Sequence, residues 1–396
     1  MPRGWRRRGA RQHRDRAGTE SARDGEGLRR SGRRRAPGIQ GGPGAHRPEG
    51  RRQQPGRGSP RIAHRIARRP RTLADLGERG FLRSIGRYVD PPSRALLVAA
   101  PRDDAAVWRG DPFVAATTDT MVEQIDFRLE WPGFDFATLG RRLISINLSD
   151  LAAMGAEPRY ALVSLTLRGT LPVADARRLY EGIAQQARRF SCAIAGGDVS
   201  GTLGLLTLTA TLVGRLSSAR SMLRRDGARA GWLLGVTGSL GGAAAGLRLL
   251  ESGRRPSTAR ERRWVSAQLD PTPRVIAGRV LVDAGIRVGG DISDGLYREV
   301  ERFLDGTRLG ATIDIERLPL ARGLHRAEWA LAVKDSEDFE LVCAAPAARI
   351  AAARRVLERI DLPLTVVGEI DARPGIRLRN GSRVERLEGA GYEHFR

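Results

Sequence analysis

The sequence is poor in residues that several common chemistries need. It has two cysteines, Cys192 and Cys343, which lie far apart in the chain. So few cysteines provide no disulfide framework, and we expect a reduced, intracellular protein. They also form no Cys/His cluster of the kind that binds zinc. Three of the five histidines precede residue 72, which leaves too few elsewhere for a convincing catalytic triad.

Long apolar runs and a phosphate-loop motif are missing too. No stretch approaches the roughly 18–20 apolar residues of a membrane span, and the N-terminus lacks the apolar core of a secretory signal. We therefore expect a cytoplasmic protein with no membrane partner. The segment 238–242, Gly-Ser-Leu-Gly-Gly, lacks the Lys-Ser/Thr pair that completes a Walker A motif. We interpret it as a place where a helix packs closely against a strand.

Positive charge is concentrated at the N-terminus. Residues 1–71 hold 22 Arg and five acidic residues, which accounts for +17 of the net charge of +23. With few apolar residues this segment cannot offset the entropy of ordering, so we predict a disordered Arg-rich tail. Its charge could attract nucleic acid, but it has almost no aromatic residues for base stacking. A dispensable extension is the interpretation we favour.

Beyond the tail, apolar spacing predicts alternating helices and strands in two domains, 72–214 and 215–396. Several strands alternate apolar and polar residues, which favours an α+β arrangement with two sheets over a parallel Rossmann sheet. Residues 251–264 are polar and charged and are predicted to form an exposed loop. Helices are expected at 73–88, 137–155, 173–189, 243–250, 272–284, 296–304 and 347–360, and strands at 96–100, 105–108, 113–116, 161–167, 192–195, 205–212, 232–237, 311–315, 339–344 and 365–370.

Acidic residues recur where apolar elements meet small residues. One such Asp usually caps a helix or stabilises a turn, and Asp150 taken alone fits that interpretation equally well. Five segments of this kind favour a site for hard divalent cations, which prefer carboxylate oxygen and share it with substrate phosphates. The pattern indicates a metal-assisted phosphoryl transferase without a P-loop. The five segments contain Asp103-Asp104, Asp119, Asp150, Asp198 and Asp291/Asp294.

Five motifs together resemble the thiamine-monophosphate kinase family, part of the aminoimidazole-ribotide-synthetase-like ATP-binding superfamily. The resemblance runs in order from about Leu73 to Phe395 and so covers all of the chain except the tail. The motifs are Asn-Leu-Ser-Asp-Leu-Ala-Ala-Met-Gly-Ala at 147–156, Gly-Gly-Asp at 196–198, Asp-Ile-Ser-Asp-Gly-Leu at 291–296, Ser-Glu-Asp-Phe-Glu-Leu at 336–341 and Gly-Tyr-Glu-His-Phe at 391–395.

The resemblance implies a fold, an activity and a partner. The N-terminal mixed-sheet domain is expected to form a β-barrel with a second subunit in a homodimer, and the C-terminal α/β domain to close over ATP. The implied reaction is Mg²⁺-dependent, in-line transfer of the ATP γ-phosphoryl group to thiamine monophosphate. Because the acceptor phosphate is already anionic, no catalytic side chain is expected to act as a strong general base.

The resemblance also assigns roles to residues of this sequence. Asp126 stands where the family usually has a substrate-contacting His, and we count it among the substrate positions. The residues that match Mg²⁺ positions are Asp103, Thr117, Thr118, Asp119, Asp150, Asp198, Asp291 and Asp294; those that match ATP contacts are Tyr180, Gly197, Arg225 and Ser293; and those that match thiamine contacts are Glu337 and Tyr392.

Departures from the family pattern fall on substrate and loop positions. Ala100-Pro101-Arg102 replaces the usual Gly-Ile-Gly, and Asp335-Ser336 replaces two glycines. Two alternatives therefore stay open at this point. One is a related ATP-using enzyme with another acceptor, and the other is a degenerate scaffold whose basic tail binds nucleic acid.

Overall fold

The computed structural model describes residues 71–91, 93–98, 107–334 and 336–387. The predicted tail, the Asp103-Asp104 pair and Tyr392 lie outside these ranges, apart from Arg71. None of the helices in the described part of the chain is both long and apolar enough to cross a membrane.

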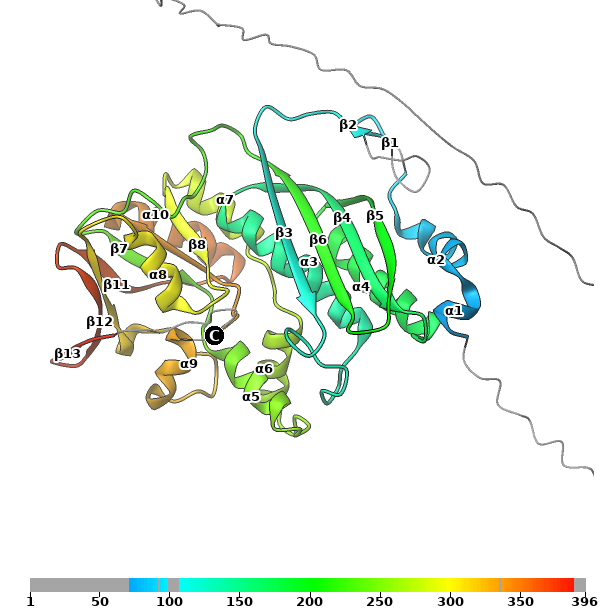
Figure 1. Cartoon of the computed structure of the whole chain (residues 1–396). Coiled ribbons are helices and arrows are strands. Elements are labelled where there is room, and N and C mark those ends of the chain that lie inside the picture. Colours follow the sequence, from blue (N-terminus) through cyan, green and yellow to red (C-terminus); the bar gives the residue numbers. More distant parts are fainter. Residues whose placement is uncertain (1–70, 92, 99–106, 335, 388–396) are drawn as a thin grey trace, which may run out of the picture. The chain divides into compact units, whose positions relative to one another are not determined.

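The first half of the described chain is built on a four-stranded sheet with the order β3-β6-β4-β5. These strands are β3 (Val114–Val122), β6 (Thr207–Arg215), β4 (Glu157–Arg168) and β5 (Ala193–Thr202). Only β4 and β5 run parallel; the other two pairings are antiparallel. Figure 1 shows the four strands side by side with α3 (Phe136–Ala153) and α4 (Val173–Arg189) against one face. Within the described residues the sheet does not close into a barrel.

The two helices approach each other unusually closely because glycine lies at their contact. A Cβ atom at Gly182 of α4 would lie 1.9 Å from the carbonyl oxygen of Ala137, and one at Gly140 of α3 would lie 2.1 Å from that of Leu179. The buried face of α4 repeats Ala176, Leu179, Ile183 and further apolar residues at helical spacing. This packing holds α3 in a fixed position against the sheet.

Short elements precede the first sheet. They are α1 (Leu73–Leu76), α2 (Glu78–Ile85), a 3₁₀ turn (Gly86–Tyr88), and the paired strands β1 (Leu96–Val98) and β2 (Val107–Trp108). A capping box between Thr72 and Asp75 begins α1. Phe81 and Ile85 of α2 are buried in the same core as α3 and α4.

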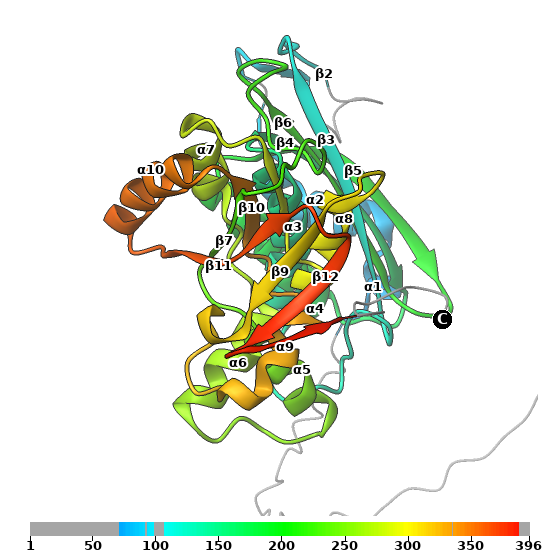
Figure 2. The ribbon, with the colours of Figure 1, turned by 90° about the vertical axis from the view of Figure 1, so that its left-hand side faces the viewer.

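A seven-stranded sheet with the order β13-β12-β9-β11-β7-β10-β8 organises the second half. Along β10, Leu341 and Cys343 belong to the core shared with α7 and α10, whereas Val342 and Ala344 belong to the core shared with α8. Helices therefore cover both faces of the sheet (Figure 2). The elements are β7 (Leu233–Thr237), α5 (Gly242–Glu251), α6 (Ala259–Leu269), α7 (Val275–Asp283), β8 (Val288–Asp291), α8 (Leu296–Leu304), β9 (Gly310–Asp314), α9 (Trp329–Val333), β10 (Leu341–Ala345), α10 (Ala347–Leu357), β11 (Leu364–Asp371), β12 (Gly375–Asn380) and β13 (Arg383–Arg386).

Helix α7 joins the second half to the first by packing on α3. A Cβ atom at Gly278 would lie 2.0 Å from the carbonyl oxygen of Ala152, so the two backbones are in direct contact. The C-terminal end of α3, which carries Asp150, is thereby brought next to β8 and its terminal Asp291. The domain boundary at 214/215 stays a prediction.

Several predictions about elements were wrong or incomplete. Strand β8 was not expected, and the helix predicted at 73–88 is interrupted at Gly77. Helix α6 begins inside the predicted loop 251–264, where Thr258 and Glu261 form a capping box, and it continues to Leu269. Strands β12 and β13 follow the last predicted strand, and the short helix α9 was not expected. The predicted strand 113–116 is only the first part of β3, which continues through the polar residues 117–120.

Segment 238–242 is a packing feature, but α5, the helix that it begins, closely approaches α6 and α9 instead of a strand. A Cβ atom at Gly238 would lie 1.9 Å from a carboxylate oxygen of Glu340. The N-terminal backbone N–H groups of Gly241 and Ala243 donate to Asp338, at 2.6 and 3.1 Å. The Asp338 carboxylate therefore occupies the N-terminal end of α5, which is the position where a phosphate loop would bind a phosphate group.

Candidate functional site

Three predicted carboxylates converge where the first sheet, α3 and β8 meet. Asp119 points inward from β3, Asp150 lies in the last turns of α3, and Asp291 ends β8. The Thr117 hydroxyl donates to Asp150 and the Ser149 hydroxyl donates to Asp291, the latter at 2.8 Å. Asp150 is therefore not a helix N-cap, and that simpler interpretation is wrong.

The pKa values of these carboxyls are raised. Burial, together with the neighbouring charge of Asp150, raises the pKa of Asp119 to about 7. Burial and the charges of Asp150 and Glu299 raise the pKa of Asp291 to about 8. The pKa of Asp150 is also raised, mainly by burial. Crowded carboxyls with raised pKa values at a cleft are a typical sign of a functional site, because a cation would relieve their repulsion.

Asp150 and Asp291 border a recess with a cavity volume of about 260 Å³, which is also lined by Thr117, Arg225 and Gly290, among others. In the described ranges, no three His, Cys, Asp or Glu side chains are already arranged as a metal coordination shell. This suits Mg²⁺, which usually takes one or two protein carboxylates and completes its shell with water and substrate phosphates. The donor set therefore fits Mg²⁺ bound together with a nucleotide.

Two charged residues of α8 that the sequence analysis did not single out, Glu299 and Arg302, bond the predicted site residues Arg225 and Asp294. Glu299 of α8 is only 1% exposed by side chain, and it accepts hydrogen bonds from Arg225 at 2.6 and 3.2 Å and from Arg302 at 2.9 Å. Arg302 also pairs with Asp294 at 2.9 Å. Asp294 thus faces an arginine, while Arg225 is held over the recess by Glu299. Glu299 lies in α8, eight residues after Asp291. Its contact with Arg225 joins distant parts of the chain and is seen only in the folded structure.

Thr118 and Asp198 do not join the other predicted metal positions. Thr118 alternates with Thr117 along β3 and faces the opposite side of the sheet. There its hydroxyl donates to the Ala210 carbonyl and accepts from the Thr211 hydroxyl. Asp198 of β5 is exposed and pairs in register with Ser164 of β4. The structure therefore divides the predicted metal residues between the two faces of the sheet.

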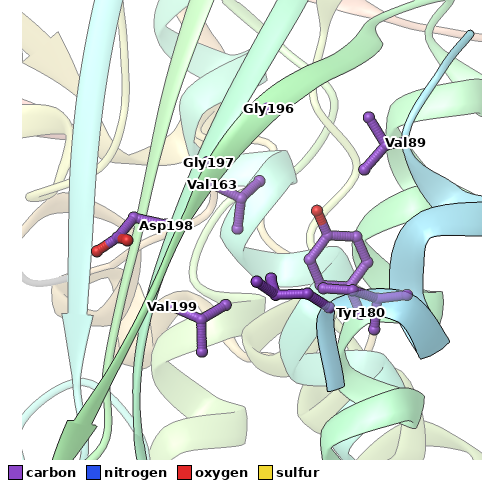
Figure 3. Close-up of a pocket in the computed structure, with 9 residues that line it drawn as sticks. Val89, Val163, Tyr180, Gly196, Gly197, Asp198 and Val199 are labelled. Carbon is purple, nitrogen blue, oxygen red and sulfur yellow. The ribbon is translucent and has the colours of Figure 1, made fainter. Parts of the chain in front are cut away.

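A small, mainly apolar pocket with a cavity volume of about 30 Å³ is lined by Tyr180 and Gly197, two of the predicted ATP positions. Figure 3 shows the Tyr180 ring with Val89, Val163 and Val199 on one side of β5, and the Asp198 carboxylate on the other. Burial raises the pKa of Tyr180 to about 12, so its hydroxyl stays protonated. A Cβ atom at position 197 would lie 1.8 Å from the Val163 carbonyl oxygen, which explains the glycine.

The remaining predicted positions are placed as follows. Ser293 is half-buried between Asp291 and α8. The Asp126 carboxylate accepts a hydrogen bond of 2.7 Å from the backbone N–H of Val122, within its own turn. Glu337 pairs with Arg142 at 2.9 Å. Asp103 and Tyr392 lie outside the described residues.

The sequence matches known families and known enzymes. Residues 102–216 match the family model described as AIR synthase related protein, N-terminal domain, and residues 229–380 match that for the C-terminal domain. The chain is 34% identical to thiamine-monophosphate kinase of Rhodopirellula baltica, over 80% of this chain and 97% of that one. It is 32% identical to the enzyme of Escherichia coli K12, over 71% of this chain and 86% of that one.

Several solved structures have a similar fold. Thiamine-monophosphate kinase from Stenotrophomonas maltophilia K279a aligns with a TM-score of 0.66 and 29% identity, over 75% of this chain and 94% of that one. AaThiL complexed with AMPPCP and TMP aligns with a TM-score of 0.62 and 26% identity, over 82% and 98%. Hydrogenase maturation protein HypE in complex with ATP, at 19% identity and a TM-score of 0.62, shares the fold.

Proposed function

Since the chain belongs to the thiamine-monophosphate kinase family, we propose that it transfers the γ-phosphoryl group of ATP directly to thiamine monophosphate, forming thiamine diphosphate. The observation that carries this proposal is the convergence of three carboxyls: Asp150 and Asp291 line an open recess beside Arg225, and Asp119 interacts with Asp150. Such a site binds polyphosphate through cations and arginine instead of a P-loop.

The residues of the chain act by binding and positioning. The apolar side chains around Tyr180 are suited to contact the base of ATP, and Arg225, oriented by Glu299, is suited to bind its phosphates. When bound at Asp119, Asp150 and Asp291, Mg²⁺ supplies positive charge that neutralises crowded phosphate oxygens. The acceptor phosphate needs no general base, so in-line alignment of the two phosphates is the main task of the site.

A homodimer is part of the proposal. The outer face of the four-stranded sheet carries exposed hydroxyl groups, including Thr118, Thr120 and Ser164, together with Asp198. A second sheet packed on this face would form the predicted barrel and enclose Thr118 and Asp198. We also place the protein in the cytoplasm, which fits its use of ATP and its two free, buried cysteines.

The test is a direct assay of the product. The full chain is incubated with ATP and Mg²⁺, with and without thiamine monophosphate, and thiamine diphosphate is measured. Formation of thiamine diphosphate that depends on both substrates is the expected result. ATP binding without that product would instead favour the alternative of a related enzyme with another acceptor, and no ATP binding would favour a degenerate scaffold.

A further inference from the structure

Arg142 of α3 is a buried arginine that the reaction as described does not use. Its side chain is 5% exposed, and its guanidinium lies 5.8 Å from the centre of the Phe339 ring. One terminal nitrogen donates to the backbone carbonyl of Gln268 in α6, and the other donates to Glu337 at 2.9 Å. A buried guanidinium is costly unless its donors are satisfied, so this arrangement fixes the side chain firmly.

Glu337 receives a second hydrogen bond, this one from helix α6. The side-chain amide of Gln268 donates to Glu337 Oε2 at 2.7 Å, so Arg142 and Gln268 bond the same carboxylate oxygen. No described residue donates to the other oxygen, Oε1, and the side chain of Glu337 is 42% exposed. One oxygen is therefore anchored inside the protein, and the other is available to a ligand.

Resting on the proposed function, we propose that Arg142 is a positioning residue for the acceptor. By anchoring Oε2, it orients Oε1 of Glu337 to accept a hydrogen bond from the exocyclic amine of the aminopyrimidine ring of thiamine monophosphate. The planar guanidinium is needed because it reaches the Gln268 carbonyl and Glu337 at once through two different nitrogens. Arg142 itself touches no substrate; it acts through Glu337.

The neighbouring residue provides a matched control. Arg141 also connects α3 to the end of α6, through an ion pair with Asp270 at 2.9 Å, but it does not contact Glu337. If Arg142 merely tied these elements together, loss of either arginine would have similar consequences. If Arg142 positions Glu337, only its loss changes recognition of the acceptor.

The experiment compares steady-state kinetics of the full-length wild type with Arg142→Met, Arg142→Lys and Arg141→Met. Arg142→Met is expected to raise KM for thiamine monophosphate about tenfold or more, with KM for ATP within about twofold. Arg142→Lys should recover part of the loss, and Arg141→Met should resemble the wild type. An unchanged KM for thiamine monophosphate in folded Arg142→Met would overturn the inference.

A double-mutant cycle separates positioning from general packing. Because Arg142 acts through Glu337, Arg142→Met combined with Glu337→Gln should be no worse than Glu337→Gln alone; additive losses would contradict the inference. Should Arg142→Met not fold, Gln268→Leu and Arg142→Lys decide the question by the same shift in KM. A wild type that makes no thiamine diphosphate would instead refute the proposed function, which keeps the two failures distinct.

Discussion

The Ser149 hydroxyl of α3 donates a hydrogen bond of 2.8 Å to the Asp291 carboxylate at the end of β8. This bond joins α3, which packs on the first sheet, to a strand of the second sheet, and both groups are almost fully buried. Because Asp150 is the residue after Ser149 in α3, the bond fixes Asp291 beside Asp150. The position of the carboxylate cluster therefore depends on how the second half of the chain packs on α3.

Asp150 is the central carboxylate of the cluster, because it interacts with both Asp119 and Asp291. We expect Asp150→Asn to lower turnover by about 1,000-fold or more, since it removes a charge that a phosphate-bound cation needs. The free energy of unfolding should stay level or rise, because repulsion among carboxylates falls. The exposed Asp283 provides a control: Asp283→Asn should retain normal turnover. Near wild-type turnover in Asp150→Asn would show that the metal assignment is wrong.

Mg²⁺ should stabilise the protein more at alkaline than at acidic pH. The pKa of Asp119 rises from 3.8 to about 7 on folding, and that of Asp291 from 3.8 to about 8. The folded chain thus holds protons that the unfolded chain releases. Without metal, the contribution of these groups to the free energy of unfolding therefore falls as pH rises from about 4 to about 8. Mg²⁺ replaces those protons and should raise the unfolding temperature more at pH 8 than at pH 5.5.

Calorimetry of the metal-free protein, with and without Mg²⁺, measures this difference at each pH. The same titration of Asp150→Asn serves as the control and should show a smaller Mg²⁺ effect. An unfolding temperature that Mg²⁺ leaves unchanged at pH 8 would argue against a cation site at these carboxylates.

Tyr180 should affect ATP more than the acceptor. Its ring forms one wall of the pocket beside Gly197. Tyr180→Leu is expected to raise KM for ATP about tenfold while KM for thiamine monophosphate changes about twofold or less. Tyr180→Phe, which keeps the ring, should lie close to the wild type. Equal effects of Tyr180→Leu on both KM values would place the nucleotide base elsewhere.

The close contact between α3 and α4 predicts a stability effect. In Gly182→Ala the new methyl group would lie 1.9 Å from the Ala137 carbonyl oxygen, so the helices must separate. We expect the free energy of unfolding to fall by about 1–3 kcal/mol. Gly86→Ala is the matched control, because nothing lies within 4 Å of its added carbon. Chemical denaturation measures both variants, and equal stabilities would contradict the packing argument.

Deletion of residues 1–71 is expected to leave turnover unchanged, because the predicted site residues all lie beyond the tail. Parallel assays of the full and shortened chains test this. A collapse in activity would make the tail part of the enzyme. Nucleic-acid binding that disappears with the tail and weakens steeply with salt would give it a separate role.

Much of the fold was predictable because it depends on local patterns. The helix at 173–189 has the predicted limits, since its apolar residues repeat at helical spacing. Helix α6 was missed because its surface is rich in arginine, and only the capping pair Thr258 and Glu261 indicates it. The polar residues of β3 concealed that the strand continues, since strands with one exposed face tolerate alternating threonines.

The site was predictable as a set of residue types but not as an arrangement. Asp119, Asp150 and Asp291 were identified from their motifs, and they do converge. The extended β3 alternates its side chains, which places Thr118 on the opposite face from Thr117. Glu299 and Arg142 were missed because long-range ion pairs leave no local pattern in a chain that is rich in arginine.

The position of β8 at the edge of its sheet affects how the protein is made. Its ladder partner among the described strands is β10, in which Leu341 is in register with Asp291. On the ribosome, the first sheet and α3 can fold while the second half is still being synthesised. Asp291 cannot be fixed until residues 341–345 have emerged, so the nascent chain carries an incomplete carboxylate cluster until late in translation.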